Sequence, residues 1–378
     1  MPTNNPDAPS RTVAPRLRVL TGGMELPVAL SAEVTQTNNF HGDRFRVRFA
    51  PPRDAGLCPL PGVGSFAWWG AQTSVLLNVQ FGIDPSPARR NAPIVGTSLI
   101  VGQVDDFSLD PDGWTVTAEG RDLTARFIDH KTEAANVNQT ASEIVAALAR
   151  KEGLTPVVTP TTTPVGTFYQ LEHVRTALDQ FSHAIREWDE IVQLARFEGF
   201  DAFVQGTSLY FQPRTQPTAA PYSLVRHIDA HGRPSGNLLS LRLNRSLTIA
   251  RGVHVVVRSW HGKQARGFTR GAPSFGLASA AENVQQYVIV RPNLTEDQAQ
   301  QLANQTYAEI VRHEKRISGQ VPGDLRLTPR VMLRLSGTGT AFDQAYYPDT
   351  ITQRIDGHGF VTEFTAKNHD PQTQVTAG

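Results

Sequence analysis

Acidic residues form the first group whose types and spacing could support chemistry. Asp105 and Asp106 are adjacent, and Glu119 and Asp122 follow them after a turn. Two carboxyl groups that share a proton can serve as a general acid and a general base. Adjacent residues of a strand point to opposite faces, so Asp105 and Asp106 are not expected to form such a pair. Amide replacements at these four positions are expected to alter stability or assembly only.

Histidines form the second group. His227 and His231 are four residues apart, which on a helix would place two metal ligands on one face. Gly232, Pro234 and Gly236 follow directly and argue against a helix at this point. We therefore expect no metal-binding pair here.

The single cysteine, Cys58, lies in a loop rich in Pro and Gly without a neighbouring histidine. A cysteine nucleophile needs a nearby base, and one cysteine cannot form an intrachain disulfide. The sequence also lacks the Gly-x-Ser-x-Gly, His-Glu-x-x-His and Walker motifs. We expect no catalytic, cofactor-binding or metal-binding residues, no cofactor and no enzyme activity.

A row of arginines could bind phosphates or the carboxylates of a partner. In residues 44–49 arginines alternate with apolar residues, so Arg44, Arg46 and Arg48 share one face of a predicted strand. The alternative is a solvated outer face of a barrel. The net charge of the chain is +1, which gives no overall attraction to nucleic acid or to anionic membranes.

Length and composition indicate a folded protein of several domains. The chain has 378 residues, of which 39% are hydrophobic and 19% charged. A chain of this length is expected to form two to four domains. No apolar run approaches the ~18 residues that span a bilayer, and the amino terminus lacks the pattern of a signal peptide. We expect synthesis and assembly in a cytoplasm and no membrane partner.

The pattern of residue types along the chain divides it into five segments. Residues 1–15 are expected to form a flexible arm and 16–130 a first β-barrel domain. Residues 131–235 are expected to form a small α/β domain. Residues 236–368 read as a second β-barrel domain with an inserted helix, and 369–378 as a tail. The predicted fold class is mainly β, with two similar β-barrel-like domains flanking the α/β domain.

A hairpin turn is predicted at Asp110-Pro-Asp-Gly113, with Gly113 supplying a positive φ. From Trp114 onward, residues alternate with the period of a strand. The turn is too short for a calcium loop, because no bidentate acid follows at the required spacing.

Two helices and a cap are predicted downstream. Thr140 to Glu143 has the form of a capping box, and residues 182–198 form a helix that Gly199 ends. Trp188 lies among aliphatic residues at helical spacing and is expected in the core. Thr295 is expected to cap a third helix, and residues 261–283 are expected to form a loop.

Several segments of the sequence also resemble a known family. Residues 96–129 contain G.VDD, AEGRDLTA and FID, followed by SEIV and LA. Further on come W.EIV.LA, DAFV.G..LYF and, near the carboxyl end, ISG.VPGD and GF.TEF.A.N. Together these segments resemble the central baseplate hub proteins of contractile-tailed bacteriophages, the late control D family. Those hubs are similar to the amino-terminal part of type VI secretion spike proteins.

The resemblance implies a structural function in a phage tail or phage-like contractile injection system. The chain would form a homotrimeric ring with pseudo-sixfold symmetry, a symmetry adaptor in the virion baseplate. Implied partners are the tail tube or a tube-initiator protein, the spike protein and neighbouring baseplate wedge proteins. DNA or tape-measure protein would pass through the lumen without specific binding. Arg44, Arg46 and Arg48 are then expected to be paired with carboxylates or turned outward.

The alternative function is a carbohydrate-binding or cell-wall-acting β-protein. Adjacent Trp68 and Trp69 are its best support, because exposed aromatic rings bind sugars. It would also require a pair of catalytic carboxylates, which the sequence does not clearly offer.

Overall fold

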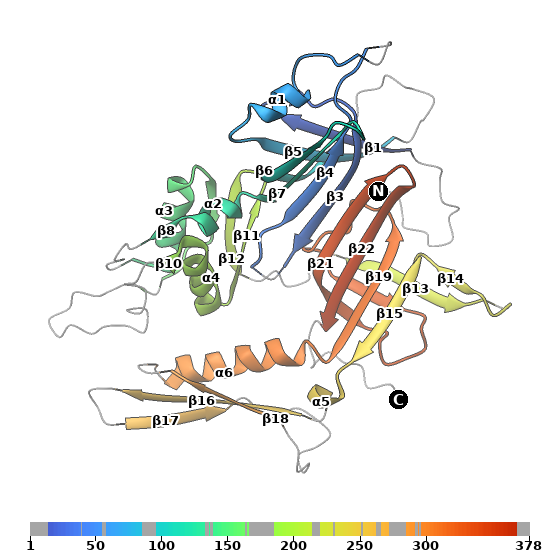
Figure 1. The fold of residues 1–378 in the computed structure, drawn as a ribbon. Coiled ribbons are helices and arrows are strands. Elements are labelled where there is room, and N and C mark those ends of the chain that lie inside the picture. Colours follow the sequence, from blue (N-terminus) through green and yellow to red (C-terminus); the bar gives the residue numbers. More distant parts are fainter. Residues whose placement is uncertain are drawn as a thin grey trace.

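Four hydrophobic cores organise the described part of the chain. The computed structural model describes residues 14–38, 40–54, 58–84, 96–132, 136, 139–162, 165, 185–213, 220–229, 231–250, 252–261, 266–271, 285–291, 294 and 296–368. Strands dominate, which confirms the predicted mainly β fold class. Figure 1 shows two adjacent β units, a small α/β domain beside the first, and a sheet with a long helix apart from both.

The N-terminal β unit is a run of strands around one core. Its elements are β1 (Ala14–Thr21), β2 (Met24–Glu25), β3 (Ala29–Thr37), β4 (Arg44–Phe49), helix α1 (Phe66–Gly70), β5 (Leu76–Asp84), β6 (Thr97–Asp110) and β7 (Thr115–Asp122). On β4 the three arginines are exposed, whereas Phe45, Val47 and Phe49 are buried. The predicted alternation therefore directs one face of this strand into the core.

The β6–β7 turn forms where expected but with different backbone geometry. The residue with positive φ is Trp114, at 50°, so the expectation for Gly113 was wrong. The N–H of Gly113 donates to Asp110 Oδ1 at 2.8 Å, and a Cβ on Gly113 would displace the exposed Asp110 carboxylate from this position. Trp114 Nε1 donates to the Pro51 carbonyl at 2.9 Å, which holds its ring beside the β4–β5 connection.

The small α/β domain follows β7. Its elements are α2 (Thr124–Asp129), β8 (Lys131–Thr132), α3 (Ala141–Lys151), β9 (Thr155–Val158), β10 (Ile185–Arg186), α4 (Glu187–Glu198), β11 (Phe200–Gln205) and β12 (Ser208–Pro213). Thr140 and Glu143 form the predicted capping box, and Gly199 ends α4 with φ 73°. Helix α4 begins at Glu187, later than predicted, and residues 182–184 lie outside the described residues. Trp188 is buried in this core, as expected.

The C-terminal β unit contains β13 (Tyr222–Ile228), β14 (Pro234–Gly236), β15 (Ser240–Arg245), β19 (Lys315–Pro322), β20 (Leu333–Ser336), β21 (Ala345–Asp356) and β22 (Gly359–Asn368). Strand β13 pairs in parallel with β20, so residues 222–236 belong to this sheet. The sequence analysis placed most of that segment in the α/β domain, because parallel pairing with a distant strand leaves no local pattern.

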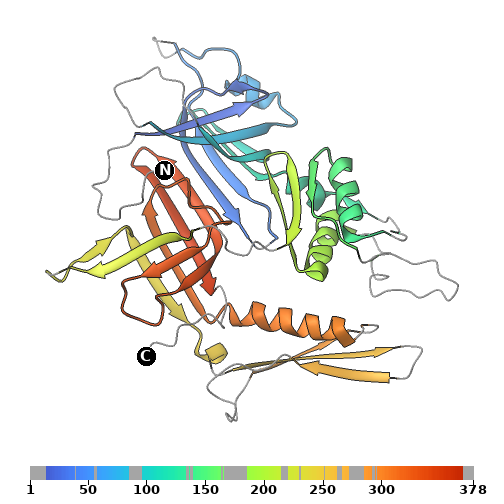
Figure 2. The ribbon, with the colours of Figure 1, turned by 180° about the vertical axis from the view of Figure 1, so that it is seen from behind.

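An additional unit is inserted between β15 and β19. It consists of α5 (Leu247–Ala250), β16 (Val253–His261), β17 (Arg266–Gly271), β18 (Gln285–Val290) and α6 (Glu296–Val311). Helix α6 packs on one face of this sheet around a separate core, as Figure 2 shows from behind. Residues 266–271 form a strand where a loop was expected. The predicted cap Thr295 lies outside the described residues.

The two β units share one strand order. The N-terminal row runs β2-β1-β5-β6-β7-β4-β3, and the C-terminal row runs β14-β13-β20-β21-β22-β19-β15. Numbered by their order along the chain, the seven strands of each unit occupy the same places. One pairing differs: β1 is antiparallel to β5, whereas β13 is parallel to β20.

At one pair of facing positions, the two β units carry a phenylalanine ring on different strands. Phe45 on β4 lies opposite Gly120 on β7, and Gly319 on β19 lies opposite Phe364 on β22. A Cβ on Gly120 would lie 2.7 Å from the Phe45 ring, and a Cβ on Gly319 would lie 3.0 Å from the Phe364 ring. In both units one phenylalanine ring thus fills this cross-strand position. The ring comes from β4 in the N-terminal unit and from β22 in the C-terminal unit.

Strand β3 joins the two units edge to edge. Residues Ala32–Thr37 pair with Thr350–Ile355 of β21, a contact we call the in-chain seam. The hydroxyls of Thr35 and Thr352 lie 3.1 Å apart across it. Both rows therefore belong to one continuous sheet with a common outer face, which is visible in Figure 1.

Candidate interaction surface

A row of charged residues crosses the outer face of the continuous sheet. Directly opposite positions on β21, β3, β4, β7 and β6 hold Arg354, Glu33, Arg46, Glu119 and Asp106. Arg354 Nε donates to Glu33 Oε2 at 3.0 Å, and Arg46 Nε lies 3.1 Å from Glu119 Oε1. Opposite charges on facing strands attract across the ladder, so the row is compensated from Arg354 to Glu119, whereas Glu119 and Asp106 are two acids that face each other.

A bulge brings more acid to the same face. Arg121 donates from Nε and Nη2 to both oxygens of Asp105, at 2.7 and 2.8 Å, and this bidentate pair raises the pKa of Arg121 above its usual range. The strand register shifts between Val104 and Asp106. The expectation that Asp105 and Asp106 point to opposite faces was wrong, because the bulge interrupts the alternation.

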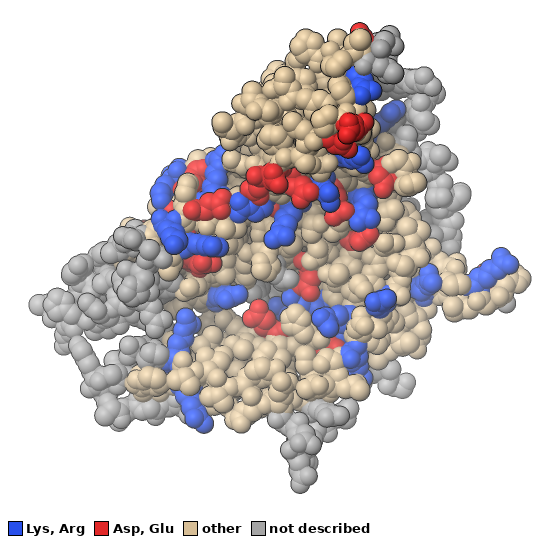
Figure 3. Space-filling view, in the orientation of Figure 1, with Lys and Arg blue, Asp and Glu red and all other residues tan. Residues whose placement is uncertain are grey.

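The three arginines of β4 lie on this face. Arg44, Arg46 and Arg48 are all exposed; Arg46 pairs with Glu119, and Arg48 Nη2 lies 3.4 Å from the Thr115 hydroxyl. In Figure 3 basic and acidic side chains are intermixed in a band across the middle of the molecule. The surface is therefore highly charged but mixed in sign.

Two strand edges next to this face are open. Strand β5 pairs with β6 as far as Gln103, and no strand in the described ranges pairs with that edge of β6 from Asp105 to Asp110. Strand β15 pairs with β19 on one side, and no described strand pairs with its other side. By strand order, β6 is equivalent to β21 and β15 to β3, the strands of the in-chain seam. The open edges are therefore the equivalents of a contact that the chain already makes.

Arg330, in the connection between β19 and β20, joins three parts of the molecule. Its Nη1 donates to the Thr37 carbonyl at 3.3 Å and to Asn38 Oδ1, at the end of β3. Its guanidinium carbon lies 3.7 Å from the centre of the Phe203 ring in the α/β domain. Burial lowers the pKa of Arg330, and the nearby charge of Asp43 opposes that shift. We call this contact the Arg330 joint.

Two buried carboxyls lie beside the Arg330 joint. Asp43 accepts from the Thr37 N–H at 2.8 Å, and Asp122 accepts from the Thr124 N–H at 3.1 Å. Burial raises the pKa of Asp43. Burial, and then the charge of Asp43, raise the pKa of Asp122 to about 8. One proton is therefore expected to remain on this pair near neutral pH.

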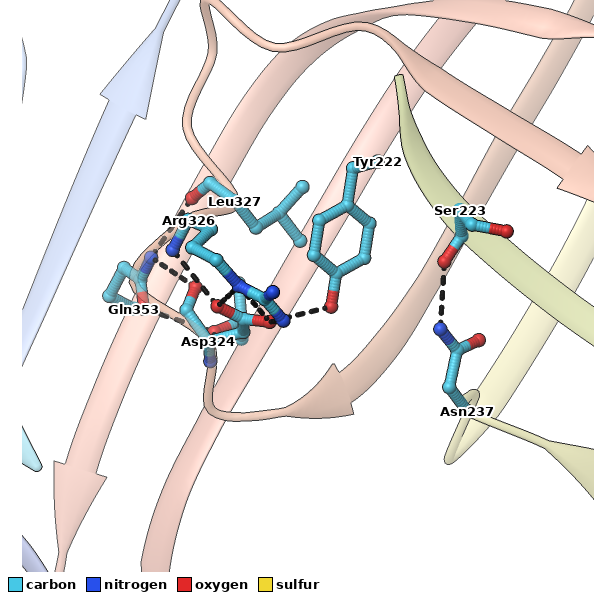
Figure 4. Close-up of polar contacts among 8 residues, drawn as sticks. Tyr222, Ser223, Asn237, Asp324, Arg326, Leu327 and Gln353 are labelled. Carbon is cyan, nitrogen blue, oxygen red and sulfur yellow. Dashed lines mark hydrogen bonds and ion pairs between the residues drawn. The ribbon is translucent and has the colours of Figure 1, made fainter. Parts of the chain in front are cut away.

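Buried polar contacts hold the connection that carries Arg330. Gln353 Nε2 donates to the Leu327 carbonyl at 3.0 Å and to the Asp324 carbonyl at 3.3 Å. The Tyr222 hydroxyl donates to Asp324 Oδ2 at 3.1 Å, and Arg326 pairs with the same carboxylate, as Figure 4 shows. These contacts fix the connection against its own β unit, so that Arg330 can reach the other one.

The remaining candidates from the sequence are dispersed. Trp69 is fully buried in the N-terminal core and Trp68 is half-buried, so the pair is not an exposed platform for sugars. Cys58 is exposed, His227 lies on β13 and His231 in the turn that follows. Sequence reasoning missed the Arg330 joint and the open edges, because neither leaves a local motif.

Comparisons with solved structures reveal the same architecture in other proteins. The chain matches the tail protein from Neisseria meningitidis MC58 with a TM-score of 0.67 and 12% identity, covering 94% of this chain and 97% of that one. It matches the 43 kDa tail protein of prophage MuSo2 from Shewanella oneidensis with a TM-score of 0.66 and 14% identity, covering 93% and 98%. The chain has the fold of phage tail proteins.

This tail-protein fold also occurs in a secretion component. The E. coli c3393 protein, a component of the type VI secretion system with structural similarity to the T4 tail proteins gp27 and gp5, matches with a TM-score of 0.52. Identity is 11%, over 94% of this chain and 78% of that one. The resemblance read from the sequence is thereby confirmed at the level of the fold. Neither a family model nor a curated protein matches the sequence.

No helix in the described ranges has both the length and the apolar character needed to cross a membrane.

Proposed function

We propose that this protein is a structural subunit of a phage or phage-like contractile tail, the central hub of its baseplate. In this function three subunits form a ring, and each subunit supplies two equivalent β units. Six equivalent units then surround the axis although only three chains are present. Such a ring satisfies a sixfold tail tube at one end and a threefold spike at the other.

The observation that carries the proposal is the repeated strand order joined edge to edge within one chain. In a pseudo-sixfold ring, the contact between the units of one chain recurs between chains. The in-chain seam joins β3 to β21, so the contact between chains joins β15 of one subunit to β6 of the next. Both of those edges are open among the described residues.

The repeat also predicts which residues face each other between subunits. Thr352 lies opposite Glu363, and Asp106 lies opposite Glu119, so Asp106 takes the place of Thr352. Strand β19 pairs with β22 and β15, just as β4 pairs with β7 and β3. When the opposite residues are followed across these strands, Arg242 on β15 takes the place of Thr35 on β3. The in-chain pair Thr35–Thr352 thus becomes Arg242–Asp106 between chains. Both side chains are exposed in the isolated chain, and their charges are complementary.

The wall of the ring would be the common outer face of the continuous sheet. On this face Arg46, Arg121 and Arg354 pair with carboxylates, whereas Arg44 and Arg48 are exposed without an ion pair among the described residues. The paired charges would weaken the salt-sensitive binding that a basic lining would cause, so that DNA or tape-measure protein could pass. The function is structural, with no catalysis. The tail tube or its initiator, the spike and the baseplate wedge proteins are the expected partners, and the virion tail baseplate is the expected location.

The assembly test uses light scattering on the full chain, followed by charge reversal. We expect a trimer that Asp106→Arg and Arg242→Asp each weaken and that the double variant restores, because the swap rebuilds the pair. Asp112→Arg, in the exposed β6–β7 turn, is the matched control. A wild-type monomer that also fails to assemble on a tube or spike partner would overturn the proposal.

A crosslinking test examines the predicted register. In a Cys58→Ser background, Asp106→Cys with Arg242→Cys should form disulfide-linked oligomers up to the trimer. Opposite positions of an antiparallel pair place Cβ atoms ~5 Å apart, which a disulfide can bridge with little movement. Asp112→Cys with Arg242→Cys serves as the control. Equal crosslinking in both combinations would contradict the β6–β15 contact.

A further inference from the structure

We propose that His130, Glu152 and Glu187 form a binding site for a divalent transition-metal cation of the zinc class in the small α/β domain. The site would connect the ends of three helices. It does not rest on the proposed tail function, because none of its three ligands belongs to the charged row of the outer face or to the open edges of β6 and β15.

The three side chains converge from elements that are distant in sequence. His130 follows the last residue of α2, Glu152 follows the last residue of α3, and Glu187 is the first residue of α4. The Glu187 N–H donates to the His130 carbonyl at 3.1 Å, which fixes the start of α4 against the end of α2. One potential ligand atom from each of the three side chains lies within 4.8 Å of the others.

The donor set matches the chemistry of zinc-class ions. His130 Nδ1 lies 2.9 Å from Glu152 Oε1, so an imidazole nitrogen and a carboxylate oxygen already face each other. One imidazole and two carboxylates are ligands that zinc accepts at about 2.0–2.2 Å, with water in an open position. Magnesium prefers oxygen ligands alone and retains most of its water, so it fits this set poorly.

Burial and charge favour a cation at this point. The side chains of Glu152 and Glu187 are only 6% and 0% exposed, whereas His130 is 58% exposed. Lys151 pairs with Glu187 Oε1, and Arg126 Nη1 donates to the backbone carbonyl of Glu152 at 2.8 Å. Glu190 is a third buried acid close by, and burial, opposed by its Asn136 hydrogen bond, raises its pKa. A buried excess of negative charge is costly unless a cation or a proton compensates it.

One oxygen of Glu187 is left available for a ligand. Glu187 Oε2 is buried and has no hydrogen-bond partner among the described residues, although Lys151 holds the other oxygen. A buried carboxylate oxygen without a partner is uncommon in native proteins. Metal coordination through Oε2 would satisfy this atom and leave the Lys151 pair intact. The exposed imidazole of His130 provides the route by which an ion enters.

Metal binding to the full chain tests the site. After treatment with a chelator, the protein is titrated with Zn²⁺ by calorimetry and with Co²⁺ by visible absorption, which reports nitrogen and oxygen ligation directly. We expect one site per chain that His130→Ala and Glu187→Gln each weaken by at least about tenfold. Mg²⁺ should not compete.

The controls separate this site from other histidines and from general acidity. Asp189→Asn changes an exposed acid on α4, and His358→Ala removes an exposed histidine of the β21–β22 turn. Both controls should bind Zn²⁺ as the wild type does. If Glu187→Gln fails to fold, His130→Ala decides, because its side chain is largely exposed. Absence of binding, or equal binding by His130→Ala and the wild type, would overturn the proposal.

Discussion

The two β units have the same strand order but use the connection between their fourth and fifth strands differently. In the N-terminal unit this connection contains α1 and places Trp69 in the unit's own core. In the C-terminal unit it is held by Gln353 and carries Arg330 outward to the end of β3. The comparison shows that the strand frame is the shared feature. The connections are free either to fill a core or to join units.

The largest effect on stability is expected at the cross-strand position that a phenylalanine ring fills in each unit. Phe45→Gly should cost about 4 kcal/mol, because it removes a buried ring. Gly120→Phe should also destabilise, because a Cβ there would lie 2.7 Å from the Phe45 ring and 2.0 Å from the Gln103 carbonyl oxygen. The double variant should recover only the part of the loss that the two rings cause by crowding each other, because the contact with the Gln103 backbone remains. Urea unfolding of the single and double variants measures this recovery.

The reciprocal exchange provides the control for the ring experiment. Phe364→Gly combined with Gly319→Phe should show the same partial recovery in the C-terminal unit, because a Cβ on Gly319 would lie 3.0 Å from the Phe364 ring but 2.3 Å from the Ser240 carbonyl oxygen. If the double variants were as unstable as the sum of their single changes, the two cross-strand positions would not be equivalent.

A smaller effect on stability is expected at the Arg330 joint, which only the C-terminal unit provides. Arg330→Met keeps the length of the side chain but loses its charged hydrogen bonds, at a cost of about 2 kcal/mol. Hydrogen exchange should increase in residues 32–37 and 350–355, the in-chain seam, while β6 and β7 remain protected. Arg326→Met is the control, because Arg326 pairs with Asp324 within its own unit. Uniform loss of protection would mean that Arg330 supports a core and not a joint.

The buried carboxyls beside the Arg330 joint should give a pH dependence. The folded pKa of Asp122 is raised to about 8 by burial and then by the charge of Asp43. Its stabilising contribution is therefore complete below its ordinary pKa and is lost as pH rises through about 8. Arg330 is the nearby cation, and Thr124 hydrogen-bonds the carboxyl.

Asp122→Asn tests the direction of this pH dependence directly. Between pH 5 and pH 9 the wild type should lose at least about 1 kcal/mol of stability relative to the variant, one pKa unit being worth about 1.4 kcal/mol. Melting temperatures across this range measure the difference. Asp112→Asn, in an exposed turn, should follow the wild type. A wild type that gains stability relative to Asp122→Asn as pH rises would contradict the raised pKa.

The sequence predicted features that depend on neighbouring residues. Alternation in 44–49 predicts a half-buried strand, and Thr140 with Glu143 predicts a helix start, because both signals are local. The family resemblance predicted the fold class, which composition alone would not have done. The bulge beside Asp106 escaped prediction, since one extra residue reverses the facing of a strand without changing its composition.

Contacts between distant segments were beyond a reading of the sequence. Arg330 meets Asn38 across 292 positions, and His130 meets Glu152 and Glu187 only after three helices have packed. Residues 222–225 pair in parallel with 333–336, although more than a hundred positions separate them. Such contacts follow from the topology, so Arg330 and the three residues of the proposed metal site were not among the candidates of the sequence analysis.

The smallest effect on stability is expected on the outer face, where the two units differ in charge. Glu33, Arg46 and Glu119 lie on the N-terminal unit, whereas the neighbouring outer positions of the C-terminal unit include Thr350 and Gln320. Exposed ion pairs contribute only about 0.2–1 kcal/mol each, so Glu33→Gln with Glu119→Gln should leave the fold almost unchanged. The same double change should strengthen binding of duplex DNA, because it releases arginines from their acidic partners.

Fluorescence anisotropy at several salt concentrations measures this binding. We expect weak binding by the wild type and tighter, steeply salt-dependent binding by the acid-neutralised variant, since each added phosphate contact displaces counterions. Arg46→Gln with Arg354→Gln removes charge from the same row and is the matched control, which should bind no more tightly than the wild type. Tight, salt-sensitive binding by the wild type would mean that the acids do not compensate the arginines. The N-terminal face would then be a nucleic-acid site, and the two units would differ in function as well as in charge.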